Sequence, residues 1–396
     1  MRLIKDDEMY DVIIIGAGPA GTCCARKLAE AGYAAIAYEK RNEIGAPKRC
    51  GEGLEKKAEK LVGKIPARCY AQKVKGARIY APNGKYLEAV MEGGGYVLER
   101  KVFDKWLAAQ AANAGAHVQS GTNVSKLILE NGYVTGVKGT NFNGEAFESK
   151  AKIVVFAGGS DSSLPKQAGL NTTCNPNLID TCVQYEMAGV KSNPNFIHIY
   201  MGNKLAPRGY VWIFPKGNKT ANVGVGVVPG KERPMVYLND FINKSDELRE
   251  ASIIEVNAGG VPVGGLLKDM ASNGFIVCGE AAHHVNPIHG GGIKEAIISG
   301  QIAAETAIKA LKAKDYSKRI LSEFNTKWWE VRGNHLSKVE KIREIMENLS
   351  DDDFNMLADT FKPEDIVEFT RGVKLQVFAK ALMKNPKLVT LARHLI

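Results

Sequence analysis

Apolar residues in the first forty positions gather in two short runs with a helix-like stretch between them. Residues 12–15 form a β-branched run, which is typical of a strand buried on both faces. Residues 22–31 have helical composition and end at Gly32, a residue that commonly follows a helix, and residues 34–38 predict another strand. The pattern therefore predicts a strand, a helix and a second strand in succession.

The rest of the chain alternates between helix-like segments and groups of short strands. Helical composition extends over residues 54–61 and 102–114, and over residues 316–396 throughout. Asn83 and Gly84 form a favoured two-residue hairpin turn between alternating segments. A β-meander is expected over residues 124–129, 134–138 and 145–150, and a buried strand over residues 152–157. Several short segments between residues 178 and 262 predict an antiparallel sheet.

This order predicts an α/β fold, in which a Rossmann-like nucleotide-binding domain is assembled from separated segments. We expect that domain to comprise residues 1–70, 100–172 and 260–330. An inserted antiparallel substrate domain would comprise residues 71–99 and 173–259, and a helical region residues 331–396.

The turn between the first strand and helix carries the G-x-G-x-x-G fingerprint of dinucleotide binding. Gly16 makes the tight turn, Gly18 lets a pyrophosphate approach the backbone, and Gly21 allows close contact of helix and strand. The helix N-terminus offers free N–H groups to phosphate. Glu39 ends the second strand, where a carboxylate accepts hydrogen bonds from a ribose. Together these features predict a dinucleotide cofactor.

Composition narrows the choice of partners and compartment. The seven cysteines include no C-x-x-C pair, which argues against a disulfide framework or a four-thiolate metal site. A formal charge of +10 fits either an anionic partner, such as phospholipid headgroups, or a generally basic surface, and no Lys/Arg block with aromatics suggests nucleic acid. Without a signal-peptide core or an apolar run of ~18–20 residues, we expect a cytoplasmic protein that could still contact a membrane surface.

A second glycine-rich element lies about 260 residues after the first. A predicted strand ends at Gly279, Glu280 follows it, and the loop of residues 286–292 closes with Gly290, Gly291 and Gly292 before a helix. A carboxylate beside a helix N-terminus suits a ribityl hydroxyl, and the glycines let backbone N–H groups approach an isoalloxazine edge. The pair of elements therefore favours FAD over a nicotinamide dinucleotide.

This arrangement resembles the flavoproteins of the para-hydroxybenzoate hydroxylase type, and more closely the geranylgeranyl reductases. The motifs that carry the closer resemblance are residues 49–54, 75–80, 96–100, 209–217 and 222–226. The resemblance implies the following FAD-contacting residues, with Arg100 near the pyrophosphate: Gly16, Gly18, Ala20, Gly21, Glu39, Lys40, Arg41, Cys50, Gly51, Arg100, Val124, Ala157, Gly158, Gly279, Glu280, Pro287, Gly290, Gly291, Gly292 and Ile293.

Two positions depart from the family pattern. The usual Asp of the G-D-A-A motif is Glu280, which is one methylene longer and still accepts hydrogen bonds. The A-D-G motif of the hydroxylases has Gly158 in place of its carboxylate, which puts direct reduction by NADPH in doubt.

The resemblance implies saturation of C=C bonds in geranylgeranyl chains of a prenylated glycerophospholipid, as in the archaeal lipid branch of the family. The electron donor stays open between reduced ferredoxin and NAD(P)H. Two other functions remain as alternatives: a flavin monooxygenase, and a flavin protein that binds lipid or transfers electrons without a catalytic step of its own.

An isolated alkene needs a proton donor, aromatic faces and a dry channel. Cys50 is the favoured donor because a thiol with a pKa near ~8.5 is protonated at neutral pH; the alternative is a buried structural thiol. Glu52 either relays the proton or forms an ion pair with Arg49 or Lys48.

Aromatic residues supply the other candidates for substrate contact. Tyr210, Trp212 and Phe214 alternate along one strand and so share a face, which suits either a prenyl chain and a transient cation or ordinary core packing. Tyr210 and Trp212 are also counted as catalytic candidates. Tyr96 is a further substrate candidate.

Two other features have alternative interpretations. His283, His284 and His289 lie inside the flavin-type loop, a spacing that argues against a metal site. Residues 373–396 are basic and amphipathic, which indicates either contact with anionic lipid, a cover over the prenyl tunnel, or a helix pair docked on the flavin domain.

Overall fold

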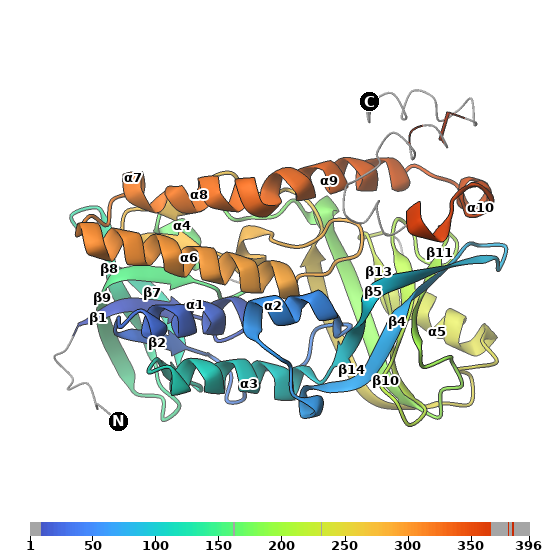
Figure 1. Cartoon of the computed structure of the whole chain (residues 1–396), viewed down its shortest axis with the longest axis horizontal. Helices are drawn as coiled ribbons and strands as arrows, with labels where there is room; N and C mark the ends of the chain where they lie inside the picture. The colour runs from blue at the N-terminus through green and yellow to red at the C-terminus, as the bar shows by residue number, and fades with distance from the viewer. Residues whose placement is uncertain (1–8, 161–162, 231, 366–378, 380–381, 384–396) are drawn as a thin grey trace.

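A parallel β-sheet forms one half of the molecule in the computed structural model, which describes residues 9–160, 163–230, 232–365, 379, 382 and 383 (Figure 1). Its strands hydrogen-bond in the order β15 (Ala271–Ser272), β16 (Phe275–Val277), β9 (Ala146–Phe156), β1 (Tyr10–Ile15), β2 (Ala35–Tyr38) and β6 (His117–Gln119). Only β15 is antiparallel within this series. The antiparallel strands β8 (Tyr133–Thr140) and β7 (Asn123–Glu130) extend the sheet from β9.

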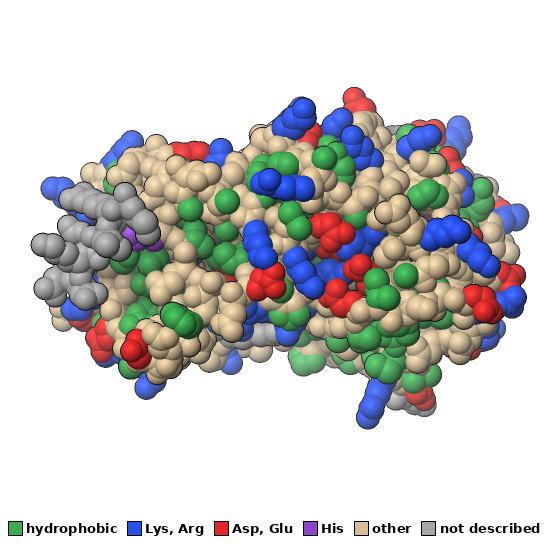
Figure 2. All heavy atoms as spheres, turned by 90° about the horizontal axis from the view of Figure 1, so that it is seen from below, with side chains coloured by type: hydrophobic (Ala, Val, Ile, Leu, Met, Phe, Trp, Pro, Cys, Tyr) green, Lys and Arg blue, Asp and Glu red, His purple; other side chains and the backbone are tan. Residues whose placement is uncertain are grey.

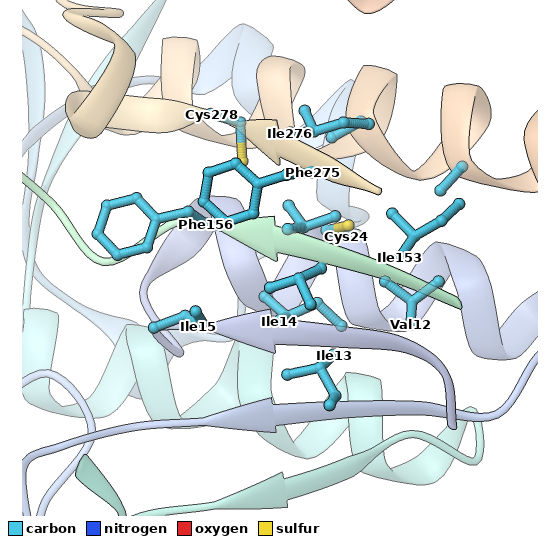
Figure 3. Packing of buried hydrophobic residues seen from close by; sticks show 14 of the residues in the cluster. Val12, Ile13, Ile14, Ile15, Cys24, Ile153, Phe156, Phe275, Ile276 and Cys278 are labelled. Atoms are coloured by element: carbon cyan, nitrogen blue, oxygen red, sulfur yellow. The ribbon is translucent and has the colours of Figure 1, made fainter. Parts of the chain in front are cut away.

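The central strands of this sheet are buried on both faces, as their β-branched sequences predict. Figure 3 shows Phe156 and Phe275 side by side above β1, with the sulfur atoms of Cys24 and Cys278 in the same core. Both thiols are fully buried, so they pack as small apolar groups in this core.

Three helices pack on the sheet and on one another. Helix α1 (Pro19–Glu30) contacts both α3 (Arg100–Asn113) and α6 (Ile293–Ala313). The connecting segments contain shorter helical turns: η1 (Lys56–Ala58), α2 (Glu59–Val62), η2 (Ala67–Cys69), α4 (Leu164–Gln167), η3 (Pro176–Leu178) and η4 (Gly279–Ala282).

The second sheet lies at the other end of the molecule (Figure 1). Its order is β14 (Ser252–Pro262), β10 (Ile179–Ala188), β13 (Thr220–Val227), β12 (Tyr210–Pro215), β11 (Phe196–Met201), β4 (Tyr70–Tyr80), β5 (Tyr86–Leu98) and β3 (Gly53–Glu55). Only the β11–β4 pair is parallel. Helix α5 (Pro234–Lys244) covers one face, where Leu238 and Ile242 are buried.

The helices after α6 run along one side of the molecule and reach the second sheet (Figure 1). They are α7 (Lys318–Leu321), α8 (Glu323–Trp328), the π-helical turn η5 (Trp329–Gly333), α9 (Asn334–Met346) and α10 (Asp351–Thr360). Ser350 caps α10 and forms a capping box with Asp353. None of the helices in the described part of the chain combines the length and apolar character needed to span a bilayer.

The α/β fold expected from the sequence is confirmed, with two local differences. Residue 54 belongs to β3 rather than to a helix, because it pairs with Tyr96 at the edge of the second sheet. Residues 145–150 and 152–157 form the single strand β9, whose first half pairs with β8 and whose second half pairs with β1. The amphipathic segment of residues 373–396 lies almost entirely outside the described residues. The proposed domain limits stay a prediction.

Figure 2 shows the face seen from below Figure 1, where acidic and basic side chains are intermixed. The excess positive charge of the chain is therefore not gathered into one patch on this face.

Candidate active site

One cavity of about 1090 Å³ joins the two halves of the protein. The dinucleotide turn after β1, the segment of residues 45–55 and the glycine loop before α6 line its polar part. Side chains of the second sheet, α9 and α10 line an apolar part. Because single-ligand pockets usually measure ~300–1,000 Å³, this cavity is large enough for a cofactor and part of a substrate.

The dinucleotide turn has the backbone geometry that its glycines predict. Gly16 has φ +100°, and a Cβ there would lie 2.5 Å from the backbone oxygen of Ala157. Gly18 is the N-cap residue of α1 and has open space where a side chain would be. A Cβ on Gly21 would lie 1.9 Å from the oxygen of Gly16, so Gly21 serves helix packing and does not line the cavity.

Glu39 holds this turn through both carboxylate oxygens. It accepts hydrogen bonds from the backbone N–H groups of Ala17 and Arg41, each at 3.0 Å. Glu39 lines the cavity, and so do the other residues predicted for this part of the cofactor site: Ala20, Lys40, Arg41, Val124, Ala157 and Gly158. The fold therefore brings these predicted cofactor-site residues together in space.

Gly158 stands where the hydroxylases have an Asp, and the structure leaves little room for a side chain at this position. A Cβ there would lie 2.8 Å from the ring of Phe156, which is buried in the core of the first sheet. Glu280 reaches the same region from the other element and accepts a hydrogen bond from the hydroxyl of Ser160 at 2.9 Å. The sequence analysis missed Ser160, which belongs to no recognised motif.

The glycine loop before α6 is held by its own polar groups. The side-chain oxygen of Asn286 accepts from the N–H groups of Ile288 and His289 at 3.0 and 3.3 Å. Six of the residues predicted for this element line the cavity: Gly279, Glu280, Gly290, Gly291, Gly292 and Ile293. Pro287 does not line it. The oxygen of Pro287 instead accepts from the Arg343 guanidinium at 3.0 Å.

Cys50 lies in the cavity wall on the segment that follows β2. Its sulfur accepts the N–H of Glu52 at 3.2 Å. Burial raises the pKa of the Cys50 thiol, and the Arg100 guanidinium opposes part of that effect. The thiol is therefore protonated at neutral pH.

Arg100 lines the cavity and is paired with other groups of the protein. Its guanidinium forms two hydrogen bonds of 2.7 Å with the carboxylate of Asp104, and it also faces the Cys50 thiol. The structure thus pairs Arg100 with an acid and a thiol. Its expected contact with a flavin phosphate stays a prediction.

Glu52 forms ion pairs in the structure, which favours an ion-pair role over a role as proton relay. It is 1% exposed, and its carboxylate lies 3.0 Å from Lys216 and 3.6 Å from Lys48. The backbone N–H of Arg100 and the side chain of Asn222 donate to it at 2.7 and 2.8 Å. Lys216 was missed because it is 164 positions away in the sequence, with no motif linking the two.

Tyr210, Trp212 and Phe214 all line the cavity, whereas Val211 and Ile213 are buried in the core on the other face of β12. The Tyr210 and Trp212 rings meet edge to face at 5.9 Å, and those of Trp212 and Phe214 lie 6.5 Å apart. The alternation along this strand correctly predicts which residues share a face.

Glycines make room for these aromatic rings. The indole of Trp212 lies over Gly224, where a Cβ would be 2.3 Å from the ring. The Phe214 ring lies 2.9 Å from the Cβ positions of Gly51 and Gly53. Gly224 on β13 and Gly51 and Gly53 in the Cys50 segment therefore allow the aromatic row to pack closely against both.

Tyr96 does not line the cavity. Its hydroxyl donates to Glu59 at 3.0 Å and its ring stacks on Tyr70, with ring centres 4.6 Å apart. It is 4% exposed in a core between the sheets and α3, so we do not carry it forward as a substrate residue.

The apolar part of the cavity contains residues that the sequence analysis did not name. Its wall on the second sheet consists of Val74, Ala77, Ile79, Leu87, Ala89, Met91, Ile197, Ile199 and Met201. The helices add Ile342, Met346, Phe354, Leu357 and Phe361. The alternation of residues 77 and 79, and of 197, 199 and 201, was a signal that could have identified the sheet residues.

The three histidines of the flavin-type loop face different surroundings. His283 lies between the backbone oxygens of Gly265 and Thr172, at 2.7 and 3.1 Å. The His284 ring stacks on Trp328, and His289 accepts the N–H of Gly291. Among the described residues, no group of three or more His, Cys, Asp or Glu side chains is placed to hold a metal.

Comparison with known proteins agrees with this geometry. Residues 179–261 match the geranylgeranyl reductase catalytic domain, and residues 10–200 match the pyridine nucleotide-disulphide oxidoreductases. A digeranylgeranylglycerophospholipid reductase of Methanosarcina acetivorans is 42% identical, with 96% of this chain and 95% of that protein covered. This chain belongs to the digeranylgeranylglycerophospholipid reductase family. The resemblance to geranylgeranyl reductases is thereby confirmed.

Another member of the family and two solved structures are also similar to this chain. The digeranylgeranylglycerophospholipid reductase of Methanocaldococcus jannaschii is 38% identical, with 100% of both chains covered. A crystal structure of a geranylgeranyl bacteriochlorophyll reductase-like protein from Thermoplasma acidophilum superposes with a TM-score of 0.90 at 36% identity, covering 98% of this chain and 100% of that one. A myxobacterial FAD-dependent halogenase, at 19% identity and a TM-score of 0.72, covering 83% of this chain and 81% of its own, shares the fold.

Proposed function

We propose that this reductase saturates C=C bonds of geranylgeranyl chains in archaeal glycerophospholipid precursors, with FAD as its cofactor. The observation that carries the proposal is the single cavity, in which the dinucleotide turn, the Cys50 segment, the aromatic row and an apolar lobe are continuous. A polar cradle alone would suit any flavoprotein. The apolar lobe adds the environment that a long prenyl chain requires.

FAD fits the polar part of the cavity on three observations. The open position at Gly18 leaves the N-terminus of α1 accessible to a pyrophosphate. Glu39 and Glu280 both line this part of the cavity, and we assign Glu39 to the adenosine ribose and Glu280 to the ribityl chain. The chain is a flavin-dependent oxidoreductase, and FAD, when bound and reduced by the electron donor, would supply the hydride for one alkene carbon.

The protein's own groups would supply the proton and the surroundings for the other carbon. Because an isolated alkene is unpolarised, a proton must be added as positive charge develops on the more substituted carbon. We assign the proton to the Cys50 thiol, which burial keeps protonated, and the resulting thiolate regains a proton from solvent. Glu52 forms ion pairs with the ammonium groups of Lys216 and Lys48, so we do not assign it the proton.

The aromatic row would contribute faces rather than protons. The hydroxyl of Tyr210 donates to the backbone oxygen of His289 at 2.7 Å, and the indole N–H of Trp212 donates to Gln184 at 2.9 Å. Both polar groups therefore have acceptors in the protein. The rings remain available to stabilise transient positive charge and to exclude water.

One anaerobic experiment tests the reaction. The purified FAD-loaded protein is reduced with dithionite, excess reductant is removed, and digeranylgeranylglyceryl phosphate is added while flavin absorbance is followed. We expect reoxidation of the flavin and products heavier by two hydrogens for each bond reduced. Reoxidation only after oxygen is admitted, with hydroxylation of an aromatic compound, would support a monooxygenase. Lipid binding without added hydrogen would support a non-catalytic carrier.

We also propose that the protein acts at the surface of a membrane in the cytoplasm, because its substrate carries two long prenyl chains. Cosedimentation with vesicles of anionic phospholipid, compared with neutral vesicles, tests this contact. The donor is proposed to be reduced ferredoxin or NAD(P)H. Anaerobic mixing of the oxidised protein with each donor identifies the one that bleaches the flavin.

A further inference from the structure

A row of four residues crosses the second sheet beside the aromatic cluster. Trp212 on β12 pairs with Gly224 on β13, which pairs with Gln184 on β10, and Gln184 pairs with Asn257 on β14. Since Gly224 has no side chain, the indole of Trp212 extends across it to the next strand. Gln184 is 4% exposed and lies behind the residues that line the cavity.

The amide of Gln184 links two residues of the proposed reaction site. Its oxygen accepts the indole N–H of Trp212 at 2.9 Å. Its nitrogen donates to the backbone oxygen of Cys50 at 3.1 Å. An indole nitrogen only donates and a carbonyl oxygen only accepts, so these two partners fix the orientation of the amide.

Asn222 on β13 binds the two residues that follow Cys50. Asn222 donates from its side chain to the oxygen of Gly51 at 3.3 Å and to the carboxylate of Glu52 at 2.8 Å. Two side-chain amides from adjacent strands thus bind three consecutive residues. Only the amide of Gln184 also contacts a residue of the aromatic row.

We propose that Gln184 is a positioning residue that fixes the Cys50 thiol and the Trp212 ring relative to each other. This inference rests on the proposed function, in which the thiol adds a proton to an alkene lying against the ring. A misplacement of either group separates the proton donor from its acceptor carbon. Gln184 itself touches neither substrate nor cofactor.

Three substitutions separate the two contacts. Gln184→Met keeps the length of the side chain and removes both hydrogen bonds, and we expect kcat to fall about ten- to a hundred-fold, since a buried polar group left without its partner costs ~1–3 kcal/mol. Gln184→Glu keeps an acceptor for Trp212 but loses the donor to Cys50, so kcat should fall with little change in KM. Trp212→Phe removes the indole N–H together with the pyrrole part of the ring, while an aromatic face remains, and should mainly raise KM.

Combining substitutions tests whether the contacts act together. If Gln184 acts partly through Trp212, the loss in kcat/KM of the Gln184→Met, Trp212→Phe double variant is smaller than the product of the single losses. Gln301→Met is the matched control, because Gln301 donates to a backbone oxygen, that of Leu61 at 2.8 Å, and does not line the cavity. We expect this control to keep wild-type kinetics.

A readout independent of turnover comes from alkylation of Cys50. The FAD-loaded protein is treated with iodoacetamide, and modification of the Cys50 peptide is followed by mass spectrometry. Gln184→Met should raise the rate about ten-fold, while Gln301→Met leaves it unchanged. Unchanged alkylation and unchanged kinetics in Gln184→Met would overturn the inference. If alkylation changes but the wild-type protein reduces no prenyl substrate, the proposed function fails and the positioning of Cys50 stands.

Discussion

The hydroxyl of Tyr210 donates a 2.7 Å hydrogen bond to the backbone oxygen of His289 and so joins the second sheet to the glycine loop before α6. Burial raises the pKa of Tyr210, so its O–H group stays a donor across the physiological pH range. The loop and the aromatic row, which come from opposite halves of the molecule, are therefore fixed to each other.

Tyr210→Phe should weaken FAD binding by about five-fold, because a typical hydrogen bond contributes ~1 kcal/mol and this one holds the loop in place. Titration of the apoprotein with FAD, followed by flavin fluorescence, measures the change. Tyr185→Phe is the control, since the Tyr185 hydroxyl donates to Asn239 at 3.1 Å in a core away from the cavity. Equal FAD affinity in both variants and the wild type would show that the loop does not depend on Tyr210.

Cys50→Ala should retain FAD and lose at least ~10²-fold in alkene reduction, the usual contribution of a positioned acid. Because burial raises the pKa of Cys50, the wild-type rate should fall only above pH ~8.5, where an ordinary thiol titrates, as the thiol loses its proton. Rapid-mixing measurements across pH provide the profile. Cys174→Ala is the control, since Cys174 does not line the cavity. Near-normal turnover in Cys50→Ala would assign the thiol a structural role.

The sequence predicts this site unevenly, and the reason lies in how far apart its partners are in the chain. The turn around Gly16, Glu39 and the face shared by Tyr210 and Trp212 depend on local backbone geometry, so their spacing was sufficient. Gln184 and Lys216 have no local pattern. They meet the Cys50 segment only because sheet register brings β10 and the end of β12 against it.

The buried charged residues near Cys50 should make the free energy of unfolding depend on pH in the acidic range. Although burial pushes the pKa of Glu186 up, the ammonium groups of Lys48 and Lys216 lower it overall. Glu186 therefore adds stability above its unfolded pKa of ~4.3, and that stability is lost as pH falls through the lower folded value. Glu186→Gln should reduce the free energy of unfolding at pH 7 by roughly 3 kcal/mol.

Urea unfolding of wild type and Glu186→Gln at pH 7 and at pH 3 measures this linkage. The difference between the two proteins should shrink at pH 3, because pH 3 lies below the unfolded pKa of ~4.3, where the stability gained from the lowered pKa is being lost. Glu148→Gln is the control, since Glu148 pairs with Lys138 on the surface, where an ion pair contributes little. A difference independent of pH would mean that Glu186 stabilises the fold through packing rather than charge.

The apolar lobe of the cavity should set the length of prenyl chain that the enzyme accepts. Ala89 on β5 is 4% exposed and lines this lobe, so Ala89→Phe places a ring in the space proposed for the chain. We expect KM for a geranylgeranyl substrate to rise about ten-fold or more, because a buried methylene contributes ~0.8 kcal/mol and two or more would be displaced. A geranyl analogue, half as long, should be affected less.

Val90→Phe is the matched control, since Val90 is the next residue on the same strand and is 62% exposed on the outer face. It tests the effect of a larger side chain on β5 without filling the lobe, and both variants should show FAD spectra and thermal unfolding close to wild type. A chain-length preference that shifts in Ala89→Phe and not in Val90→Phe assigns the lobe to the prenyl chain. If long and short substrates lose activity equally in Ala89→Phe, the substitution acts on the fold, and the chain must bind elsewhere.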